Sequence, residues 1–318
     1  MILDLGDALR ASSLRLARIG RVQSVIEESP GTRDILARYI AGDTTQSALG
    51  AARDLMETGR AVTVSYLGPD ADSRASSDAT VEEYRRLVAE AVSRGLVGDH
   101  CLELSVRPAV FGRLDQATGR SLALAQLQRV CRTAHNAGLD VTLDMEGFET
   151  VEPTLRLLEE LRQDFPRVGV ALQAALLRTE QDCRELAAEG VRVRLVKGAH
   201  KLDERGSFDA VEDVDRSYVR CLRILMEGVG YPMVATHDPR MTSIAAALAR
   251  SCGKGPEDFE YQMYLGIRPL EQTAIADRGD RMRVYVAYGP AWYSYLVRRV
   301  AERPTNVTFF VRSLLSRR

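Results

Sequence analysis

Cysteine is scarce in this sequence, and its few copies are not paired. The five cysteines among 318 residues are scattered, and no two of them form a CxxC pair. An odd number without close pairs argues against a disulfide framework and a thiolate zinc site, and it fits a reducing compartment. The four histidines show no HxxxH spacing, although Asp144 and Glu146 could form an acidic metal pair. We therefore expect no metal site.

Long apolar runs and an excess of charge are also missing. No apolar run approaches the roughly 18 residues that a membrane-spanning helix needs. The first residues lack a charged segment followed by an apolar one, so no signal peptide is expected. The formal net charge of −1 gives no electrostatic reason to expect nucleic acid or an acidic membrane as the main partner. These absences together predict a cytoplasmic protein.

What the sequence does contain is a regular alternation from residue 60 onward. Short apolar runs rich in β-branched residues alternate with longer amphipathic stretches, which implies parallel strand pairing. Eight such units over roughly 250 residues match a closed (β/α)8 barrel of the TIM type. An open doubly wound sheet is the rival, but no GxGxxG follows the first run. The eight runs are Val62–Leu67, Leu102–Val106, Val141–Met145, Val168–Gln173, Val191–Val196, Met233–Thr236, Phe259–Tyr264 and Val284–Val286.

The chain divides into a helical segment over residues 1–58 and a catalytic barrel over residues 59–318. Apolar spacing of three and four predicts helices around 35–40 and 48–55, and further helices over Thr80–Ala91 and Thr179–Ala188. The stretch Gly68–Thr80 is rich in Asp, Ser and Ala, and it is expected to be a loop or lid after the first strand.

The active site of such a barrel lies at the carboxyl ends of the strands, so polar residues there are the candidates. Their cations and amides suit an anionic, phosphate-bearing ligand together with a carboxylate. The Lys197-Gly198-Ala199 segment combines a lysine with exposed backbone N–H groups, a plausible pyrophosphate cradle. The other candidates are Arg107, Asp144, Glu146, Gln173, Arg194, His200, Thr236, His237, Asp238, Gln262, Tyr264, Arg283 and Tyr285.

The end of the chain carries one more functional pattern. Tyr295, Arg298, Arg299 and Glu302 are spaced at three and four, so they share one face of a predicted helix that Pro304 ends. A helix lying across the barrel mouth could use this face to clamp a carboxylate.

Each of these residues taken alone also has an ordinary structural interpretation. Lys197 could be a strand-end lysine or the Schiff-base lysine of an aldolase. His237 would more often be a hydrogen-bonded structural histidine, and Tyr264 with Tyr285 would usually be barrel core. His200 could serve in acid–base chemistry or only fill space.

Five segments in order resemble the proline dehydrogenase family. They are Leu195–Ala199, Ala235–Asp238, Phe259–Met263 with Gly266–Arg268, Arg283–Val286 with Tyr288–Gly289, and Tyr295–Arg299 with Ala301–Pro304. The resemblance implies a barrel with FAD at the strand ends and a final helix over the mouth. It also implies that a cyclic amino acid gives up a hydride, that the cyclic imine is the product, and that a quinone receives the electrons. Quinone use would bring the protein transiently to the inner face of a membrane.

The resemblance also assigns roles to residues. Arg298 and Arg299 look like the clamp on the substrate carboxylate, and Asp144 looks like the acid that pairs with Arg298. Tyr285 and Tyr295 look like walls of the substrate pocket. The residues that look like the FAD-binding set are Gln173, Arg194, Lys197, Gly198, Ala199, Thr236, His237, Gln262 and Glu302.

The sequence departs from the family pattern near the substrate. Arg107 replaces a lysine, His200 and Ala175 replace tyrosines, and Tyr264-Leu265 replaces a leucine followed by tyrosine. These changes alter the shape and polarity of the expected pocket, and Arg for Lys is not a neutral exchange. L-Proline is the first candidate substrate, and another cyclic or N-substituted amine is the alternative. A barrel lyase using Lys197 and a flavoprotein without catalytic activity are the competing hypotheses.

Overall fold

The computed structural model describes residues 39–198, 206–292 and 295, and these residues form a closed parallel barrel. Each strand pairs with its neighbour in sequence, and β1 also pairs with β8, from Ala61 opposite Arg283 to Tyr66 opposite Tyr288. All eight predicted strands are present, so the predicted barrel is confirmed. The strands are β1 Ala61–Tyr66, β2 Leu102–Val106, β3 Asp140–Leu143, β4 Gly169–Gln173, β5 Arg192–Val196, β6 Tyr231–Ala235, β7 Glu260–Tyr264 and β8 Met282–Tyr288.

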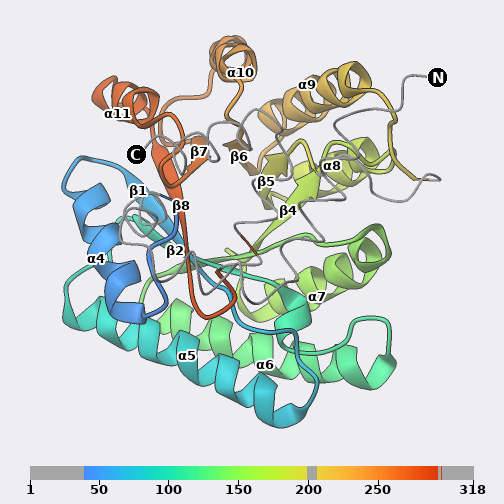
Figure 1. Cartoon of the computed structure of the whole chain (residues 1–318). Coiled ribbons are helices and arrows are strands. Elements are labelled where there is room, and N and C mark those ends of the chain that lie inside the picture. The colour runs from blue at the N-terminus through green and yellow to red at the C-terminus, as the bar shows by residue number, and fades with distance from the viewer. Residues whose placement is uncertain (1–38, 199–205, 293–294, 296–318) are drawn as a thin grey trace, which may run out of the picture.

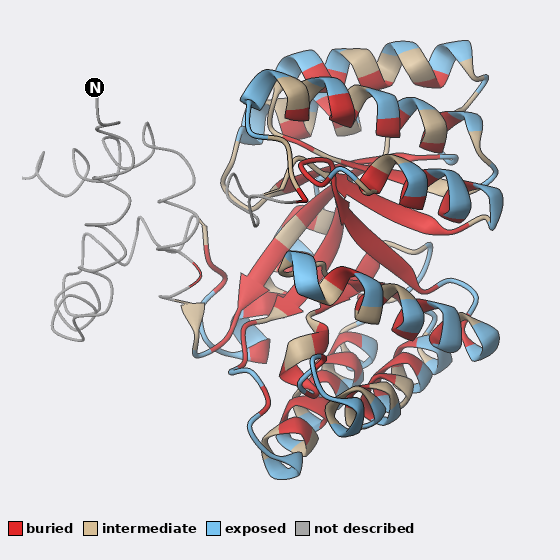
Figure 2. Ribbon diagram, turned by 90° about the vertical axis from the view of Figure 1, so that its right-hand side faces the viewer, coloured by how far each residue is buried: buried red, intermediate tan, exposed pale blue. Residues whose placement is uncertain are grey.

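A ring of helices surrounds the strands (Figure 1). Figure 2 shows that each helix turns its buried side toward the strands and its exposed side outward. The predicted helices at 80–91 and 179–188 are therefore confirmed as parts of this ring. The α-helices are α4 Thr45–Met56, α5 Arg74–Ser93, α6 Ala117–Asn136, α7 Val151–Asp164, α8 Thr179–Ala188, α9 Val211–Glu227, α10 Pro239–Ser251 and α11 Pro269–Asp277, with short 3-10 turns η1 Pro108–Val110 and η2 Phe148–Thr150.

Local side chains fix where several helices begin. A capping box joins Ser73 and Ser76 at the start of α5, so the helix begins at Arg74 and the expected loop over 68–80 is shorter than predicted. Asp238 caps α10 by accepting a hydrogen bond from the Arg240 N–H at 3.0 Å, directly before Pro239. This cap sets α10 at the end of β6, close to the expected site.

The prediction of a helix around Ile40 is wrong for the part that the structure describes. Tyr39 lies in a turn and Ile40 lies outside any helix. The N–H of Ala41 donates to the Ala287 carbonyl at 3.1 Å, so the chain runs beside β8 here. Ile40 is buried in a small apolar cluster with Leu67, Ala287 and Tyr295, which accounts for its apolar character without a helix.

The interior of the barrel is unusually rich in charge. Barrels of this type are commonly filled with branched apolar residues. Here Arg192 and Glu103 form an ion pair at 2.8 Å, and their strands, β5 and β2, are not neighbours, so the pair crosses the interior. Arg283 pairs with Glu260 at 2.7 Å, and both are buried. Buried charges are tolerated only when they are paired and hydrogen-bonded, so this network fixes the barrel's internal packing.

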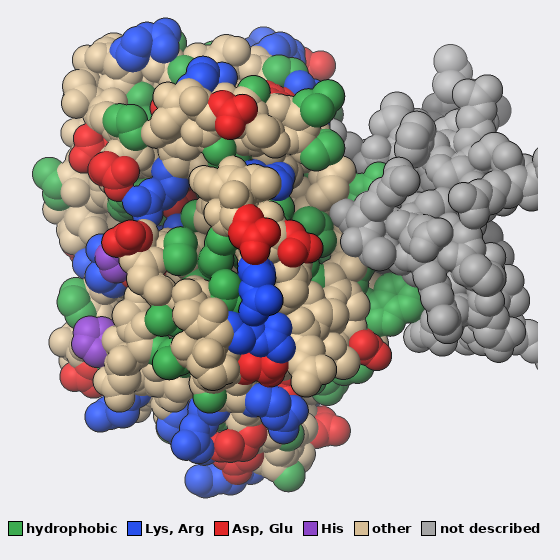
Figure 3. All heavy atoms as spheres, turned by 90° about the vertical axis from the view of Figure 1, so that its left-hand side faces the viewer, with side chains coloured by type: hydrophobic (Ala, Val, Ile, Leu, Met, Phe, Trp, Pro, Cys, Tyr) green, Lys and Arg blue, Asp and Glu red, His purple; other side chains and the backbone are tan. Residues whose placement is uncertain are grey.

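The outer surface shows no comparable concentration of charge on the face that Figure 3 presents. Basic and acidic side chains are intermixed across the described part of that face. This mixture agrees with the near-zero formal net charge. No helix in the described part of the chain is both long enough and apolar enough to span a bilayer.

Candidate active site at the barrel mouth

Arg194 is the central side chain at the barrel mouth, the opening at the carboxyl ends of the strands. Its Nη1 donates to Ser105 Oγ at 2.6 Å and to Asp144 Oδ1 at 2.8 Å. Its Nε donates to Gln262 Oε1 at 2.7 Å, and its Nη2 reaches Glu103. Burial alone would lower the pKa of Arg194, but Glu103 and Asp144 together raise it. The result is a fixed, buried cation held by four side chains from β2, the end of β3, and β7.

Asp144 links this cation to an aromatic wall. Its Oδ1 also accepts from Ser105 Oγ at 2.7 Å, and its Oδ2 accepts from the Tyr285 hydroxyl at 2.9 Å. The Arg194 guanidinium lies 5.5 Å from the Tyr285 ring centroid, within cation–π range. Burial and the neighbouring Asp144 raise the pKa of Tyr285 well above its ordinary value, so its hydroxyl remains a donor.

Tyr264 and His237 extend the wall toward β6. The ring of Tyr264 meets that of Tyr285 edge-on, with centroids 5.3 Å apart, and lies 5.2 Å from the His237 ring. His237 Nε2 accepts a hydrogen bond from the Tyr264 N–H at 3.0 Å. Thr236 Oγ1 accepts from the Asp238 N–H at 3.1 Å. These bonds order the turn after β6 and hold the His237 ring against Tyr264.

Lys197 lies at the end of β5 between two carboxylates. It forms ion pairs with Asp215 of α9 and with Asp238, the latter at 3.1 Å. Arg240 bridges the same two carboxylates from outside, at 3.1 and 2.8 Å. Its hydrogen bond to Asp238 is the main cause of the strongly lowered pKa of that carboxyl group. The lysine is thus held in place before any ligand arrives.

The backbone of Gly198 lies close to the side chain of Gln173, beside this lysine. Gly198 has φ +95°, and a Cβ there would lie 3.0 Å from Gln173 Oε1 and 3.2 Å from the Ala175 Cβ. Only glycine adopts this conformation without strain, and the missing side chain leaves the backbone accessible. The Gln173 Nε2 donates to the Glu146 carbonyl at 2.7 Å, so β4 is tied to the end of β3.

Arg107 connects the first loop to this side of the mouth. It donates to the Gly68 carbonyl at 2.8 Å and pairs with Asp70 at 3.2 Å and Glu146 at 3.4 Å. Burial raises the pKa of Glu146, an effect that Arg107 partly offsets. The arginine therefore joins the loop after β1 to the end of β3.

Several predicted site residues lie outside the described part of the chain: Ala199, His200, Arg298, Arg299 and Glu302. The expected pairing of Asp144 with Arg298 and the expected final helix over the mouth therefore also lie outside the described part of the chain. Tyr295 is described and buried, and Tyr285 packs against the same apolar cluster. The described residues hold no group of three or more His, Cys, Asp or Glu suited to a metal ion.

Three residues that support the site were not predicted from the sequence. Glu103 and Ser105 occupy alternate positions in the β2 run, and both face Arg194. A buried acid inside an otherwise apolar run was the signal that could have revealed Glu103. Asp215 lies on α9, 18 positions after Lys197, and no local pattern connects the two.

Comparison with known proteins gives sequence matches over most of the chain. The family model described as "Proline dehydrogenase" matches residues 48–312. Proline dehydrogenase 1 of Bacillus subtilis strain 168 is 34% identical over 289 residues, covering 90% of this chain and 93% of that protein. Proline dehydrogenase of Deinococcus radiodurans is 31% identical over 284 residues, covering 89% and 90%.

A solved structure shows the same fold at lower identity. Proline utilization A from Bdellovibrio bacteriovorus superposes with a TM-score of 0.77 at 22% identity, over 85% of this chain. This chain spans about a third, 32%, of that much longer protein. At this identity the likeness establishes the barrel fold alone.

Proposed function

The chain belongs to the proline dehydrogenase family, and from this premise we propose that it oxidises L-proline at the C–N bond. The product is the cyclic imine of pyrroline-5-carboxylate type, and a flavin, FAD, takes up the hydride. The observation that carries the proposal is the buried cation Arg194 at the barrel mouth, set between Asp144 and the aromatic wall of Tyr285. The family match over most of the chain supports the reaction class.

The residues at the mouth fit a flavin. Gln173, Lys197, Thr236 and His237 lie at the ends of β4, β5 and β6, and Arg194 and Gln262 lie within β5 and β7. Together they supply cations and amide groups. Gly198, at φ +95°, follows the lysine and has no Cβ to crowd the side chains of Gln173 and Ala175. A hydrogen-bonding ring system and an anionic diphosphate suit this donor set. We assign these residues, with Gly198, Ala199 and Glu302, to FAD.

The substrate side of the proposal uses the remaining candidates. Arg298 and Arg299 bind the carboxylate, because two guanidinium groups offer bidentate hydrogen bonds. Tyr264, Tyr285 and Tyr295 form the pocket walls. Arg107 and His200 shape the pocket where this chain departs from the family pattern.

When bound, a flavin supplies the hydride acceptor. This chain's own residues position the reactants and exclude water. Arg194 places a fixed positive charge at the mouth, where preorganised charge in a dry site is most effective. Asp144 holds both Arg194 and the Tyr285 hydroxyl, so the cation and the aromatic wall keep a fixed mutual orientation.

The test of the function is reduction of the bound flavin by candidate substrates. We expect yellow purified protein whose flavin absorbance is bleached anaerobically by L-proline. Hydroxyproline, pipecolate and N-alkylated analogues distinguish proline from the alternative cyclic or N-substituted amines. Heat release and chromatography identify the flavin as FAD. Protein that takes up no added FAD would contradict the proposal.

The same experiment separates the two competing hypotheses. A flavoprotein without catalytic activity binds FAD and is not bleached by any compound in the panel. A Schiff-base lyase is recognised by borohydride trapping of a carbonyl substrate on Lys197. The family match over residues 48–312 argues against the lyase.

Replacing Lys197 should weaken flavin binding selectively. In Lys197→Met the ammonium is lost while Asp215 and Asp238 remain, so an anionic ligand would face two carboxylates. A charge-assisted hydrogen bond contributes about 1.5–3 kcal/mol, so the dissociation constant of FAD should rise roughly tenfold to a hundredfold. Titration of the apoprotein, followed by flavin fluorescence, measures this. Arg216→Met, at an exposed position of α9, is the control, and an equal effect there would contradict the assignment.

The electron acceptor completes the proposal. We assign a quinone as the partner, with transient contact at the inner face of the membrane and an otherwise cytoplasmic location. The family resemblance supports this assignment. Reduction of a water-soluble quinone analogue by the proline-reduced enzyme is the measurement that checks it.

A further inference from the structure

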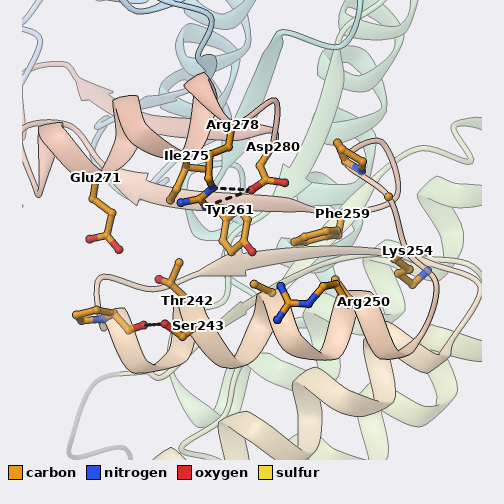
Figure 4. A pocket seen from close by; sticks show the side chains of 15 residues that line it. Thr242, Ser243, Arg250, Lys254, Phe259, Tyr261, Glu271, Ile275, Arg278 and Asp280 are labelled. Carbon is orange, nitrogen blue, oxygen red and sulfur yellow. Dashed lines mark hydrogen bonds and ion pairs between the residues drawn. The ribbon is translucent and has the colours of Figure 1, made fainter.

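A cavity lies outside the barrel, between α10 and α11. Its volume is about 460 Å³, within the range of small-molecule sites. Figure 4 shows α10 and α11 as its two sides, with Phe259 and Tyr261 between them. Gln262, the next residue after Tyr261, bonds to Arg194 inside the barrel, so Tyr261 faces outward because strand side chains alternate. The cavity is therefore separated from the mouth by the wall of β7.

Tyr261 brings an unused hydrogen-bonding group to this cavity. Its side chain is 1% exposed and lines the cavity, and its ring contacts Phe259 edge-on at 5.2 Å. Its hydroxyl makes no hydrogen bond to any described residue. Burial raises the pKa of Tyr261 to about 12, so the hydroxyl is a donor at neutral pH. Because Tyr261 lines the cavity, its hydroxyl can donate to an acceptor bound there.

The charges around the cavity favour an anion. Its two acidic side chains already have basic partners, in the pairs Arg268–Glu271 and Arg278–Asp280. Arg250 and Lys254 also line the cavity, and neither forms an ion pair with a described residue. Asp280, Arg278 and Arg250 all act electrostatically on the Tyr261 hydroxyl, and of these only Arg250 has no ion-pair partner among the described residues. The rest of the lining includes apolar side chains such as Ala246 and Ile275.

We propose that this cavity is a binding site for a small organic carboxylate with an apolar body. Arg250 and Lys254 bind the carboxylate, and the Tyr261 hydroxyl donates a hydrogen bond to it. The apolar body lies against Phe259 and Ile275. The site is independent of the flavin and of the substrate pocket, because β7 lies between them.

The test uses the flavin-loaded enzyme and two probes of similar shape, 1-naphthoate and the uncharged 1-naphthalenemethanol. Calorimetric titration should show saturable binding of one naphthoate per chain and at least tenfold weaker binding of the alcohol. The double variant Arg250→Gln/Lys254→Gln should bind naphthoate at least tenfold more weakly. Tyr261→Phe removes only the unpartnered hydroxyl, so it should fold normally and bind roughly threefold to tenfold more weakly. Arg85→Gln, an exposed position on α5, is the matched control.

Four results would overturn the proposal. Naphthoate could fail to bind saturably, or it could bind no better than the alcohol. Affinity could be the same in the double variant and the control. Binding that disappears when the enzyme is saturated with proline would place the probe at the barrel mouth instead.

Discussion

Glu103→Gln should destabilise the protein by about 3–5 kcal/mol, because it removes one partner from a buried charge network. Glu103 is fully buried and accepts from Thr63 at 2.9 Å while pairing with Arg192 and Arg194. Glutamine keeps the shape, but it leaves two buried arginines without their shared negative charge. Urea unfolding followed by circular dichroism, with the free energy extrapolated to water, measures the loss.

A surface carboxylate supplies the control for this substitution. Glu82 pairs with Arg85 at 2.9 Å, the same kind of contact, but both side chains are 53% exposed. Exposed pairs contribute little, so Glu82→Gln should change the unfolding free energy by less than about 0.5–1 kcal/mol. Similar losses at the two positions would show that burial of the network is not what makes Glu103 important.

The pH dependence of stability gives a second measure of the same residue. Burial alone would raise the pKa of Glu103, but Arg194, Arg283 and Arg192 lower it to about 2, from an ordinary value of 4.5. A carboxyl group whose pKa is lower in the folded state than in the unfolded state stabilises the protein at pH values above the unfolded pKa. That contribution is lost as the pH falls toward the folded pKa. The stability difference between wild type and Glu103→Gln should therefore shrink as pH falls from 4.5 toward 2. A difference that stays constant across this window would contradict the assigned charge.

The barrel was predictable because its signal is local and repeated. Runs such as Leu102–Val106 place apolar side chains such as Leu104 outward against helices, and turn residues separate each run from the next helix. The spacing of apolar residues gives a wrong prediction near Ile40. There Ile40 packs against Leu67 and Tyr295, which are distant in sequence, so spacing alone could not reveal that Tyr39 and Ile40 lie outside any helix.

The candidate site was predictable only in part, for a related reason. Arg194, Gln262 and Tyr285 lie within β5, β7 and β8, and the closed barrel brings inward-facing side chains together whatever their distance in sequence. Which side chains bond across the mouth depends on rotamers and register. The sequence therefore indicated Asp144 but not its bonds to Ser105 and Arg194. The carboxylate from α9 that holds Lys197 was unpredictable for the same reason.

Arg194→Lys and Arg194→Met should separate the charge of this residue from its geometry. The guanidinium reaches Ser105, Asp144, Gln262 and Glu103 at once, and a single ammonium cannot reproduce that fork. Both variants should retain less flavin, and turnover should fall on the order of a hundredfold, as when one preorganised donor is lost. The flavin-to-protein ratio and the steady-state kcat measure these two effects.

The reduction potential of the bound flavin distinguishes catalysis from structural support. Lysine keeps a positive charge at the mouth, whereas methionine leaves Glu103 and Asp144 without Arg194. If Arg194 stabilises the negative charge of the reduced cofactor, the potential should fall slightly in Arg194→Lys and further in Arg194→Met. A redox titration of the flavin-bound fraction, with an indicator dye, gives this order. Unchanged potentials alongside a loss of unfolding free energy would instead assign Arg194 to the stability of the barrel, because weakening of the buried charge network around Glu103 would then explain both variants.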